Sequence, residues 1–251
     1  PEMEMVVKLG VLQDEKMYDK VKDFLVWNTL DNDWITIEEL KEKEHKIIYY
    51  TTKDAQDVGI SNLYKEKGLP VILTQPMIDN PLMQKLEEKL QIQFKRIDSS
   101  LEESFLDTSK EKTLLDAEGK SGSMQIADFI RSTLSLGDTE VEAKSLSSEI
   151  ITALFVIDEQ ARRFKEFMMT HSKASDAIEL PQKKTFVVNT NNALIDKAFQ
   201  WKDSKPELAK KLVEHVYDLA RLSQKEISAK DLSAVVERSQ DVLEALTSAI
   251  D

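Results

Sequence analysis

The sequence predicts an α/β domain followed by a mostly helical α+β domain that contains a small sheet. Three observations support this fold class. Short apolar runs alternate with helical stretches over residues 46–97, which indicates a small three-layer αβα arrangement around a parallel sheet. A charged stretch of small residues then interrupts the chain over residues 107–123. Two long amphipathic segments, residues 206–223 and 231–250, occupy its end.

Composition supports a folded protein and argues against several classes of function. The 251 residues suffice for one or two domains of about 150 residues each. The net charge of −12 argues against a nucleic-acid partner, because phosphate binding needs a basic surface. The chain has no cysteine, which excludes disulfides and thiol nucleophiles and fits a reducing compartment. No apolar run approaches the roughly 20 residues of a membrane span. Pro1 is not a natural start, so we expect the protein to extend upstream.

Helical spacing and cap residues predict the first elements. Apolar residues recur at helical spacing from Met17 to Leu25, so we expect a helix over residues 13–27. Thr36 and Glu39 have the spacing of a capping box, which predicts a short helix at that point.

Three buried strands and two helices alternate in the predicted parallel sheet. Each strand is a short run rich in β-branched or aromatic residues, at residues 46–50, 69–73 and 93–97. The first helix should cover residues 54–67 and end at Gly68, which favours a C-cap. The second should cover residues 81–90, with Pro81 in its first turn. We expect the first domain to span residues 1–106, with its small subdomain from about residue 28, and the linker to span residues 107–123.

The second predicted domain, residues 124–251, combines three strands with helices. Strands are expected at residues 141–146, 150–157 and 184–190. Helices are expected at residues 124–134, 159–169, 193–201, 206–223 and 231–250. Asp158 should cap the second of these helices, and Asn191 with Asn192 should form a polar break after the last strand.

The sequence shows no pattern typical of a catalytic, nucleotide or metal site. The first crossover, residues 51–55, has no glycine, although a phosphate cradle needs glycine for close backbone approach. His45, His171 and His215 lie far apart and no pair has the i, i+4 spacing of metal ligands, which favours surface or packing roles. We therefore expect no catalytic residue, cofactor or metal in this chain.

One short helical segment has the composition of an adaptable binding surface. Phe164, Phe167 and Met168 share one helix face, and Met169 extends it. Phenylalanine and methionine together suit the binding of many partners. A helix that faces the core explains the same spacing equally well, and the polar residues 170–175 that follow keep the exposed alternative open.

The two terminal helices each carry an apolar stripe. The predicted strands look too few and short to cover the last helix, so a symmetric dimer built from four helices is the economical solution. The alternative is a monomer that buries both stripes against its own sheet. The expected dimer interface consists of Leu212, Val216, Leu219, Leu222, Leu232, Val235, Val236, Leu243 and Leu246.

Several stretches, taken in order, extend one pattern over nearly the whole chain. They begin at Val7 (VKLGVLQDEKMYDKV), Trp34 (WITIEE), Lys46 (KIIYY) and Lys67 (KGLPVIL), and they end with the strand and helices from Lys184 onward. This order resembles the heat shock protein 90 chaperone family, specifically the end of its middle domain and its carboxy-terminal dimerisation domain.

The resemblance implies a homodimeric chaperone that closes over unfolded or partly folded client proteins. In that family ATP and magnesium bind in an amino-terminal domain that this chain lacks, so the chain itself is not expected to be an ATPase. The family implies a cytoplasmic location. The chain ends at Asp251 without the Met-Glu-Glu-Val-Asp tail of eukaryotic members, which favours the bacterial type.

The resemblance also implies where clients bind. The implied contacts are Leu82 and Met83 in the first domain and Phe164, Phe167, Met168 and Met169 in the second. Bacterial relatives can carry tryptophan where Pro81 stands, so the first patch lacks a large aromatic anchor. Two other hypotheses stay open, an α/β enzyme domain with an attached dimerisation module and a dimeric scaffold without a client surface.

Overall fold

The computed structural model describes residues 3–14, 16–42, 46–52, 58–110, 119–134, 136, 139–159, 162–163, 184–224 and 227–248. The chain divides into two compact units. The first unit comprises Pro1–Gln56, Ser61–Ser99 and Glu159–Leu180, and the second comprises Asp57–Ile60, Ser100–Asp158 and Pro181–Asp251. Within the described residues, no helix is long and apolar enough to cross a membrane.

A three-stranded parallel sheet lies in the first unit, as the sequence predicts. Its strands are β3 (Ile47–Thr52), β4 (Val71–Thr74) and β5 (Gln93–Arg96). Central β3 pairs in parallel with β4 on one side and with β5 on the other. The connecting helices are α4 (Val58–Glu66) and α5 (Pro76–Leu90). Every residue of β4 is buried, which fits a strand covered on both faces.

The helix predicted over residues 13–27 is wrong. The chain instead forms α1 (Glu4–Gln13), α2 (Met17–Val21), a short helical turn at Lys22–Phe24 and strand β1 (Val26–Asn28). Strand β1 pairs with β2 (Trp34–Thr36) in an antiparallel hairpin. Leu25 and Trp27 alternate with half-buried Val26, a strand periodicity that the helical spacing of the preceding residues concealed.

A capping box begins α3 (Ile37–Glu42), as predicted. The Glu39 backbone N–H donates to Thr36 Oγ1 at 3.1 Å, and Glu39 Oε2 accepts from the Thr36 backbone N–H at 2.7 Å. The predicted start of α5 is wrong, because the helix begins at Pro76 and Pro81 lies inside it. Pro76 already supplies the proline favoured in a first turn.

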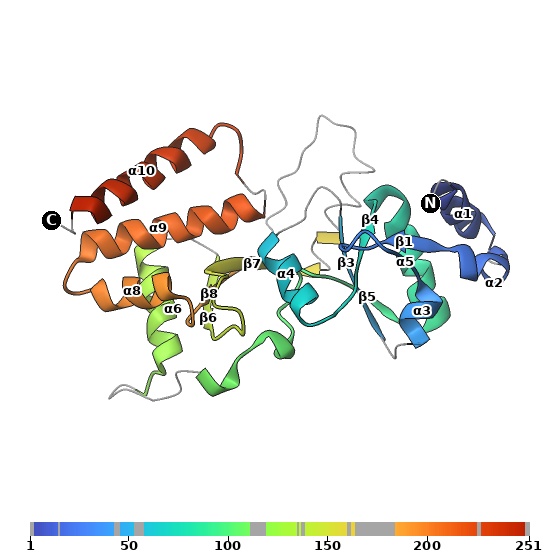
Figure 1. Cartoon of the computed structure of the whole chain (residues 1–251), viewed down its shortest axis with the longest axis horizontal. Coiled ribbons are helices and arrows are strands. Elements are labelled where there is room, and N and C mark those ends of the chain that lie inside the picture. The colour runs from blue at the N-terminus through green and yellow to red at the C-terminus, as the bar shows by residue number, and fades with distance from the viewer. Residues whose placement is uncertain are drawn as a thin grey trace. The chain divides into compact units, whose positions relative to one another are not determined.

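Helix α1 packs beside α5 around a buried charged pair (Figure 1). Lys8 Nζ lies 2.8 Å from Asp79 Oδ1, and Trp27 Nε1 donates to the same oxygen at 2.9 Å. The second oxygen of Asp79 accepts from the Gln75 backbone N–H at 2.6 Å. This network satisfies both buried charges, as burial of ionised groups requires.

The second unit is built on a mixed sheet of three strands. They are β6 (Glu140–Lys144), β7 (Ala153–Ile157) and β8 (Lys184–Asn189). Central β8 is parallel to β6 and antiparallel to β7. Strand β7 begins three residues later than predicted, because the preceding loop bonds to the side chain of Asn189.

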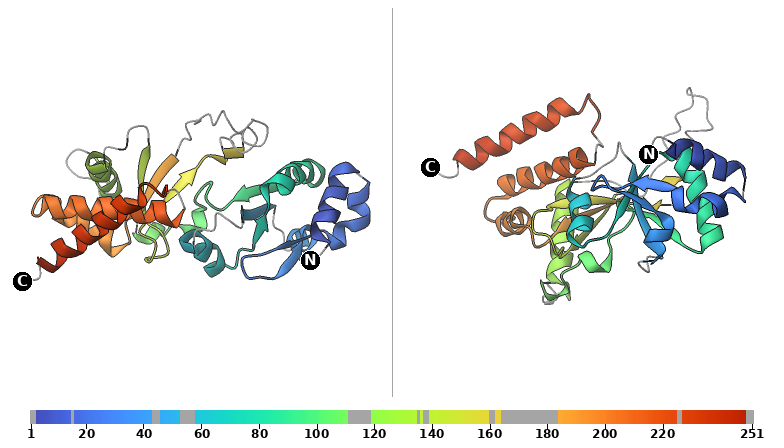
Figure 2. Two further views of the ribbon diagram at one scale, coloured as in Figure 1. Left: turned by 90° about the horizontal axis from the view of Figure 1, so that it is seen from above. Right: turned by 45° about the vertical axis from the view of Figure 1, so that its right-hand side comes forward.

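Four described helices accompany this sheet: α6 (Gly122–Leu134), α8 (Ala193–Trp201), α9 (Pro206–Ser223) and α10 (Leu232–Ser248). The core of the unit joins α6, α8 and α9 to the strands, and the tilted rings of Phe155 and Phe186 pack within it with centroids 5.1 Å apart. Figures 1 and 2 show α10, in red, running beside α9.

Part of the predicted linker belongs to this second unit. Residues 107–110 are described there, where the Asp107 backbone N–H donates to Ser145 O at 2.8 Å. Leu106 forms an isolated β-bridge with Leu146, and Phe105 is buried just before it. The compact units therefore divide near Ser99, earlier than the boundary expected at residue 107.

Polar side chains organise the loop before β7 and the edges of the sheet. Asn189 has no exposed surface, and its amide makes four hydrogen bonds with backbone groups of Leu146, Ser148, Ile151 and Asn191, at 2.7 to 3.0 Å.

The backbone of each edge strand of the sheet forms hydrogen bonds with a side chain that lies in a helix or directly after one. Gln224 accepts from the Phe155 N–H of β7 at 2.6 Å and donates to its carbonyl at 2.9 Å. Arg131 donates to Val141 O of β6 at 3.0 Å. Such contacts occupy backbone groups that an edge strand otherwise offers to another chain.

Candidate functional site

The hairpin of α9 and α10 exposes several large apolar side chains. Leu219 and Leu222 lie near the end of α9, whereas Leu232 and Val236 lie near the start of α10. Because the two helices form a hairpin, these four residues lie at the same end of it. Leu243 continues the α10 row two turns farther along and is 64% exposed. We call Leu219, Leu222, Leu232, Val236 and Leu243 the hairpin face.

An ion pair between a buried aspartate and a partly exposed arginine joins the two helices of this hairpin. Asp218 of α9 is only 2% exposed, and its carboxylate accepts two hydrogen bonds from Arg238 of α10. Arg238 Nε lies 2.6 Å from Oδ2 and Nη2 lies 2.9 Å from Oδ1. The bond to Asp218 raises the pKa of Arg238. Two parallel hydrogen bonds of this kind fix geometry as well as charge.

A histidine contact lies beside this pair. His215 Nδ1 is 3.3 Å from Ser239 Oγ, and that hydroxyl donates to Val235 O at 2.9 Å. The tautomer of His215 sets which atom of the His215–Ser239 contact is the donor. Burial lowers the pKa of His215 and the charge of Asp218 opposes that shift, so the neutral ring is favoured here.

The side chains of the nine residues predicted for a dimer interface differ in how far they are exposed. Leu212, Val216 and Val235 are buried within the chain and offer little surface to a second copy, so their role in a dimer stays a prediction. Leu212 and Val216 belong to the core of the second unit, and Val235 is buried on the α10 side of the hairpin. Leu246 is half-buried. The other five are the hairpin face, and their role in a dimer stays a prediction.

The two client contacts expected on α5 are also buried. Leu82 and Met83 pack in the core of the first unit and offer little surface to a client, so their role in client contact stays a prediction. They lie on the inner side of α5 with Leu86, as their helical spacing requires. Phe164, Phe167, Met168 and Met169 lie outside the described residues.

Other apolar side chains are exposed in the first unit. Met77 in the first turn of α5 is 80% exposed, and Phe24 before β1 is 70% exposed. Trp34 at the start of β2 is also exposed. Exposed methionine and aromatic side chains provide adaptable apolar contacts for a partner.

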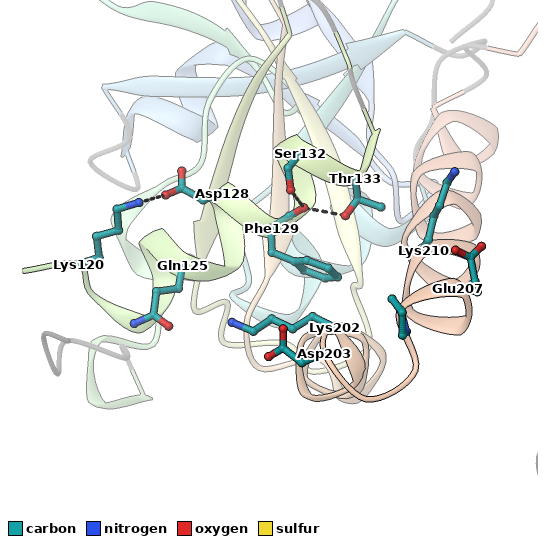
Figure 3. A pocket seen from close by; sticks show the side chains of 11 residues that line it. Lys120, Gln125, Asp128, Phe129, Ser132, Thr133, Lys202, Asp203, Glu207 and Lys210 are labelled. Carbon is teal, nitrogen blue, oxygen red and sulfur yellow. Dashed lines mark hydrogen bonds and ion pairs between the residues drawn. The ribbon is translucent and has the colours of Figure 1, made fainter. Parts of the chain in front are cut away.

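A polar groove of about 880 Å³ separates α6 from the turn between α8 and α9 (Figure 3). Phe129 lies between the two walls, and Lys120 bonds to Asp128 at 2.7 Å on the α6 side. The bond to Lys120 lowers the pKa of Asp128. The groove lining also includes two further lysines and two further carboxylates, Lys202, Lys210, Asp203 and Glu207. The positive and negative charges of the lining balance, so the groove favours neither an anionic nor a cationic ligand.

A cluster of charged groups surrounds Tyr50 in the first unit. Tyr50 Oη donates to Glu159 at 2.7 Å and accepts from Arg162 at 3.1 Å. Burial and the neighbouring Glu159 raise the pKa of Tyr50 to about 12, although Arg162 opposes the shift. Arg163 donates to Phe94 O at 2.9 Å. These contacts join Glu159, Arg162 and Arg163 to Tyr50 of β3 and to Phe94 of β5.

Among the residues that the structure describes, no three histidine, aspartate or glutamate side chains are placed to hold a metal ion. His215, the only one of the three histidines with a described position, packs between two helices.

Sequence reasoning missed the residues that fix these surfaces, although a signal was present. Asp218 interrupts the apolar stripe of α9 between Val216 and Ala220, and Arg238 lies between Val235 and Val242 on α10. Opposite charges inside the apolar stripes of two consecutive helices indicate an interhelical ion pair.

Comparison with known proteins gives one consistent family. The model of the Hsp90 protein family matches residues 2–250. The chaperone protein HtpG of Porphyromonas gingivalis is 25% identical over 248 residues, which cover 91% of this chain and 36% of that protein. The chaperone protein htpG of Bacteroides fragilis is 24% identical over 215 residues, covering 77% of this chain and 30% of that protein.

A eukaryotic relative shows the same partial coverage. The mitochondrial TNF receptor-associated protein 1 homolog of Dictyostelium discoideum is 24% identical over 231 residues, which cover 86% of this chain and 32% of that protein. The chain thus spans about a third of the length of the curated relatives it matches. Because the family model matches from residue 2 to residue 250, this chain belongs to the Hsp90 protein family.

Proposed function

We propose that this chain supplies homodimerisation and client binding to an Hsp90-type, ATP-dependent chaperone of the bacterial kind. The observation that carries the proposal is the exposed hairpin face on a chain that matches the Hsp90 model along its length. Five large apolar side chains on one helical hairpin form a surface that a second copy covers by pairing the same elements. Family membership favours this function over an α/β enzyme with an attached dimerisation module.

We assign ATP and magnesium to the part of the relatives that lies beyond this chain. The crossover at residues 51–55 lacks the glycine of a phosphate cradle. The described acidic side chains do not form a metal-binding group. The proposed role of this chain is therefore to bind protein partners.

The dimer is tested by sedimentation equilibrium at tens of micromolar. We compare the unmodified chain with Val236→Asp/Leu243→Asp, which places two carboxylates on the hairpin face. Loss of two buried apolar side chains removes about 3–6 kcal/mol of association free energy, which raises the dimer Kd at least about a hundredfold. Met77→Asp is the matched control, because it makes the same change at an exposed apolar residue of the other unit.

The expected result is a dimer for the unmodified chain and for Met77→Asp, and a folded monomer for the double variant. Far-ultraviolet circular dichroism checks that helix content is unchanged. An unmodified chain that sediments as a monomer would contradict the proposed dimer. A double variant that remains dimeric would exclude the hairpin face as the interface.

Client binding is tested with a permanently unfolded probe, reduced and carboxymethylated α-lactalbumin, by fluorescence anisotropy. We infer that exposed Met77 and Phe24 contribute to client contact in the first unit, in place of buried Leu82 and Met83. Met77→Asp/Phe24→Asp should weaken probe binding by about a hundredfold or more, since each of the two side chains contributes about 1.5–3 kcal/mol when buried. Binding unchanged from that of the unmodified chain would exclude these two residues as a client surface.

A further inference from the structure

Few apolar contacts of α10 are buried. Among its described residues only Val235 and Val242 are buried apolar side chains, whereas Ala234, Ala245 and Leu246 are half-buried. The two valines lie seven residues apart, about two helical turns, and have the same shape. Two valine side chains bury little apolar surface between the helices. The apolar contacts alone therefore do not select one arrangement of α10 on α9.

The pair Asp218–Arg238 does select one arrangement. Both hydrogen bonds, at 2.6 and 2.9 Å, require the planar guanidinium to face the carboxylate edge on. A shift of α10 by one residue moves Arg238 by about 1.5 Å along the axis and about 100° around it. Asp218 would then be a buried carboxylate without the two donors of Arg238, an arrangement that proteins avoid.

The same contact fixes the direction in which the α10 residues of the hairpin face point. Leu232, Val236 and Leu243 belong to the same rigid helix as Arg238, so their direction follows from its register. The contact of His215 with Ser239, one residue beyond Arg238, supports the same register at 3.3 Å. Leu219 and Leu222 lie on α9 itself and do not move with α10. Only one register places all five residues of the hairpin face in the arrangement seen here.

We propose that Asp218 and Arg238 are positioning residues for dimerisation, which set the register of α10 and thereby align the hairpin face for a second copy. This inference depends on the proposed homodimer. Buried polar pairs specify register in other helical assemblies, where they select one arrangement among several of similar stability. The pair thus determines which surface is presented, in addition to joining the helices.

The test separates hairpin stability from dimer affinity. Arg238→Met leaves Asp218 buried and unpaired, and should weaken both the hairpin and the dimer. Asp218→Leu/Arg238→Met replaces the pair by apolar groups, a change that often preserves or increases stability. For this double variant we expect the urea midpoint of the unmodified chain together with a dimer Kd raised at least about tenfold, because the register is no longer specified.

Arg238→Lys provides a second variant that keeps a charge near Asp218. Its ammonium cannot form two parallel hydrogen bonds, so we expect normal helix content and a dimer Kd raised about three- to tenfold. Hydrogen exchange of the α10 amides reports whether the helix remains docked. Dimer affinity is measured by sedimentation velocity over a dilution series.

The outcomes distinguish the two proposals. An unmodified chain that is monomeric contradicts the proposed dimer itself. A normal dimer in which the double variant and Arg238→Lys bind as tightly as the unmodified chain overturns the positioning role and leaves the dimer intact. Restored stability with weakened affinity supports the positioning role, since a purely structural pair would restore both.

Discussion

Removal of the Asn189 side-chain amide should destabilise the second unit more than any other single polar substitution in its loops. Asn189 is fully buried, and its amide satisfies two backbone N–H groups and two backbone carbonyls. Asn189→Ala leaves all four without this partner. Leu146 and Ile151 are buried, so their N–H and carbonyl have no ready access to water.

The magnitude follows from these contacts in two ways. Four hydrogen bonds at a net value of about 1 kcal/mol each give about 4 kcal/mol. Two buried backbone groups left unsatisfied at about 1–3 kcal/mol each give about 2–6 kcal/mol. We therefore expect a loss of about 4 kcal/mol in the free energy of unfolding of the second unit. Asn191→Ala is the control, because the Asn191 side chain makes one bond there, to Leu146 O at 2.8 Å, and should lose about 1 kcal/mol.

Native-state hydrogen exchange measures this effect within one unit. Protection of the Leu146 and Asn191 amides, which both donate to Asn189, should fall by the full difference. Amides of β3 belong to the first unit and provide an internal reference. A loss below about 1 kcal/mol, or one equal to that of Asn191→Ala, would refute the view that Asn189 organises this loop.

Three further predictions concern single side chains. Gln224→Ala should lower the free energy of unfolding by about 1–2 kcal/mol and speed exchange of the Phe155 amide, to which Gln224 bonds; unchanged exchange would count against its edge role. Tyr50→Phe should lower the free energy of unfolding by about 1–2 kcal/mol. Because burial raises the pKa of Tyr50 to about 12, the absorbance of ionised tyrosine at about 295 nm should be the same below pH 11 in Tyr50→Phe and in the unmodified chain. Burial lowers the pKa of His215 from 6.5, so its contribution to stability is full above that pH and is lost as the pH falls below it. The urea midpoint of His215→Gln should therefore fall less between pH 7.5 and 5.5 than that of the unmodified chain, and equal falls would contradict this.

The sequence predicts those elements whose local pattern agrees with their surroundings. The three parallel strands, the capping box at Thr36 and Glu39, and the helices α8 and α9 all appear as expected. In each case the apolar period, the cap residue or the flanking polar break favours one conformation. Gly68 likewise adopts a φ of 64°, which suits the C-cap predicted for it.

The failures occur where distant contacts decide the conformation. Residues from Met17 to Leu25 have helical spacing, yet the segment ends in strand β1 because Trp27 pairs with Ile35 and bonds to Asp79. The start of β7 was misplaced because Asn189, far along the chain, bonds to the backbone of Ile151. Local propensity contains no information on either partner.

Apolar periodicity also cannot tell a side chain that faces its own core from one that faces a partner. Val235 and Val236 are adjacent in one predicted stripe, but the first is buried and the second is exposed. The difference arises from the angle of α10 on α9, which Asp218 and Arg238 determine through a contact twenty residues apart in sequence. The polar residues inside an apolar stripe therefore specify the register that the stripe leaves open, because the two hydrogen bonds of a bidentate pair are both formed in one register. In this hairpin, an interface prediction from sequence has to begin with its charged residues and assign the apolar ones afterwards.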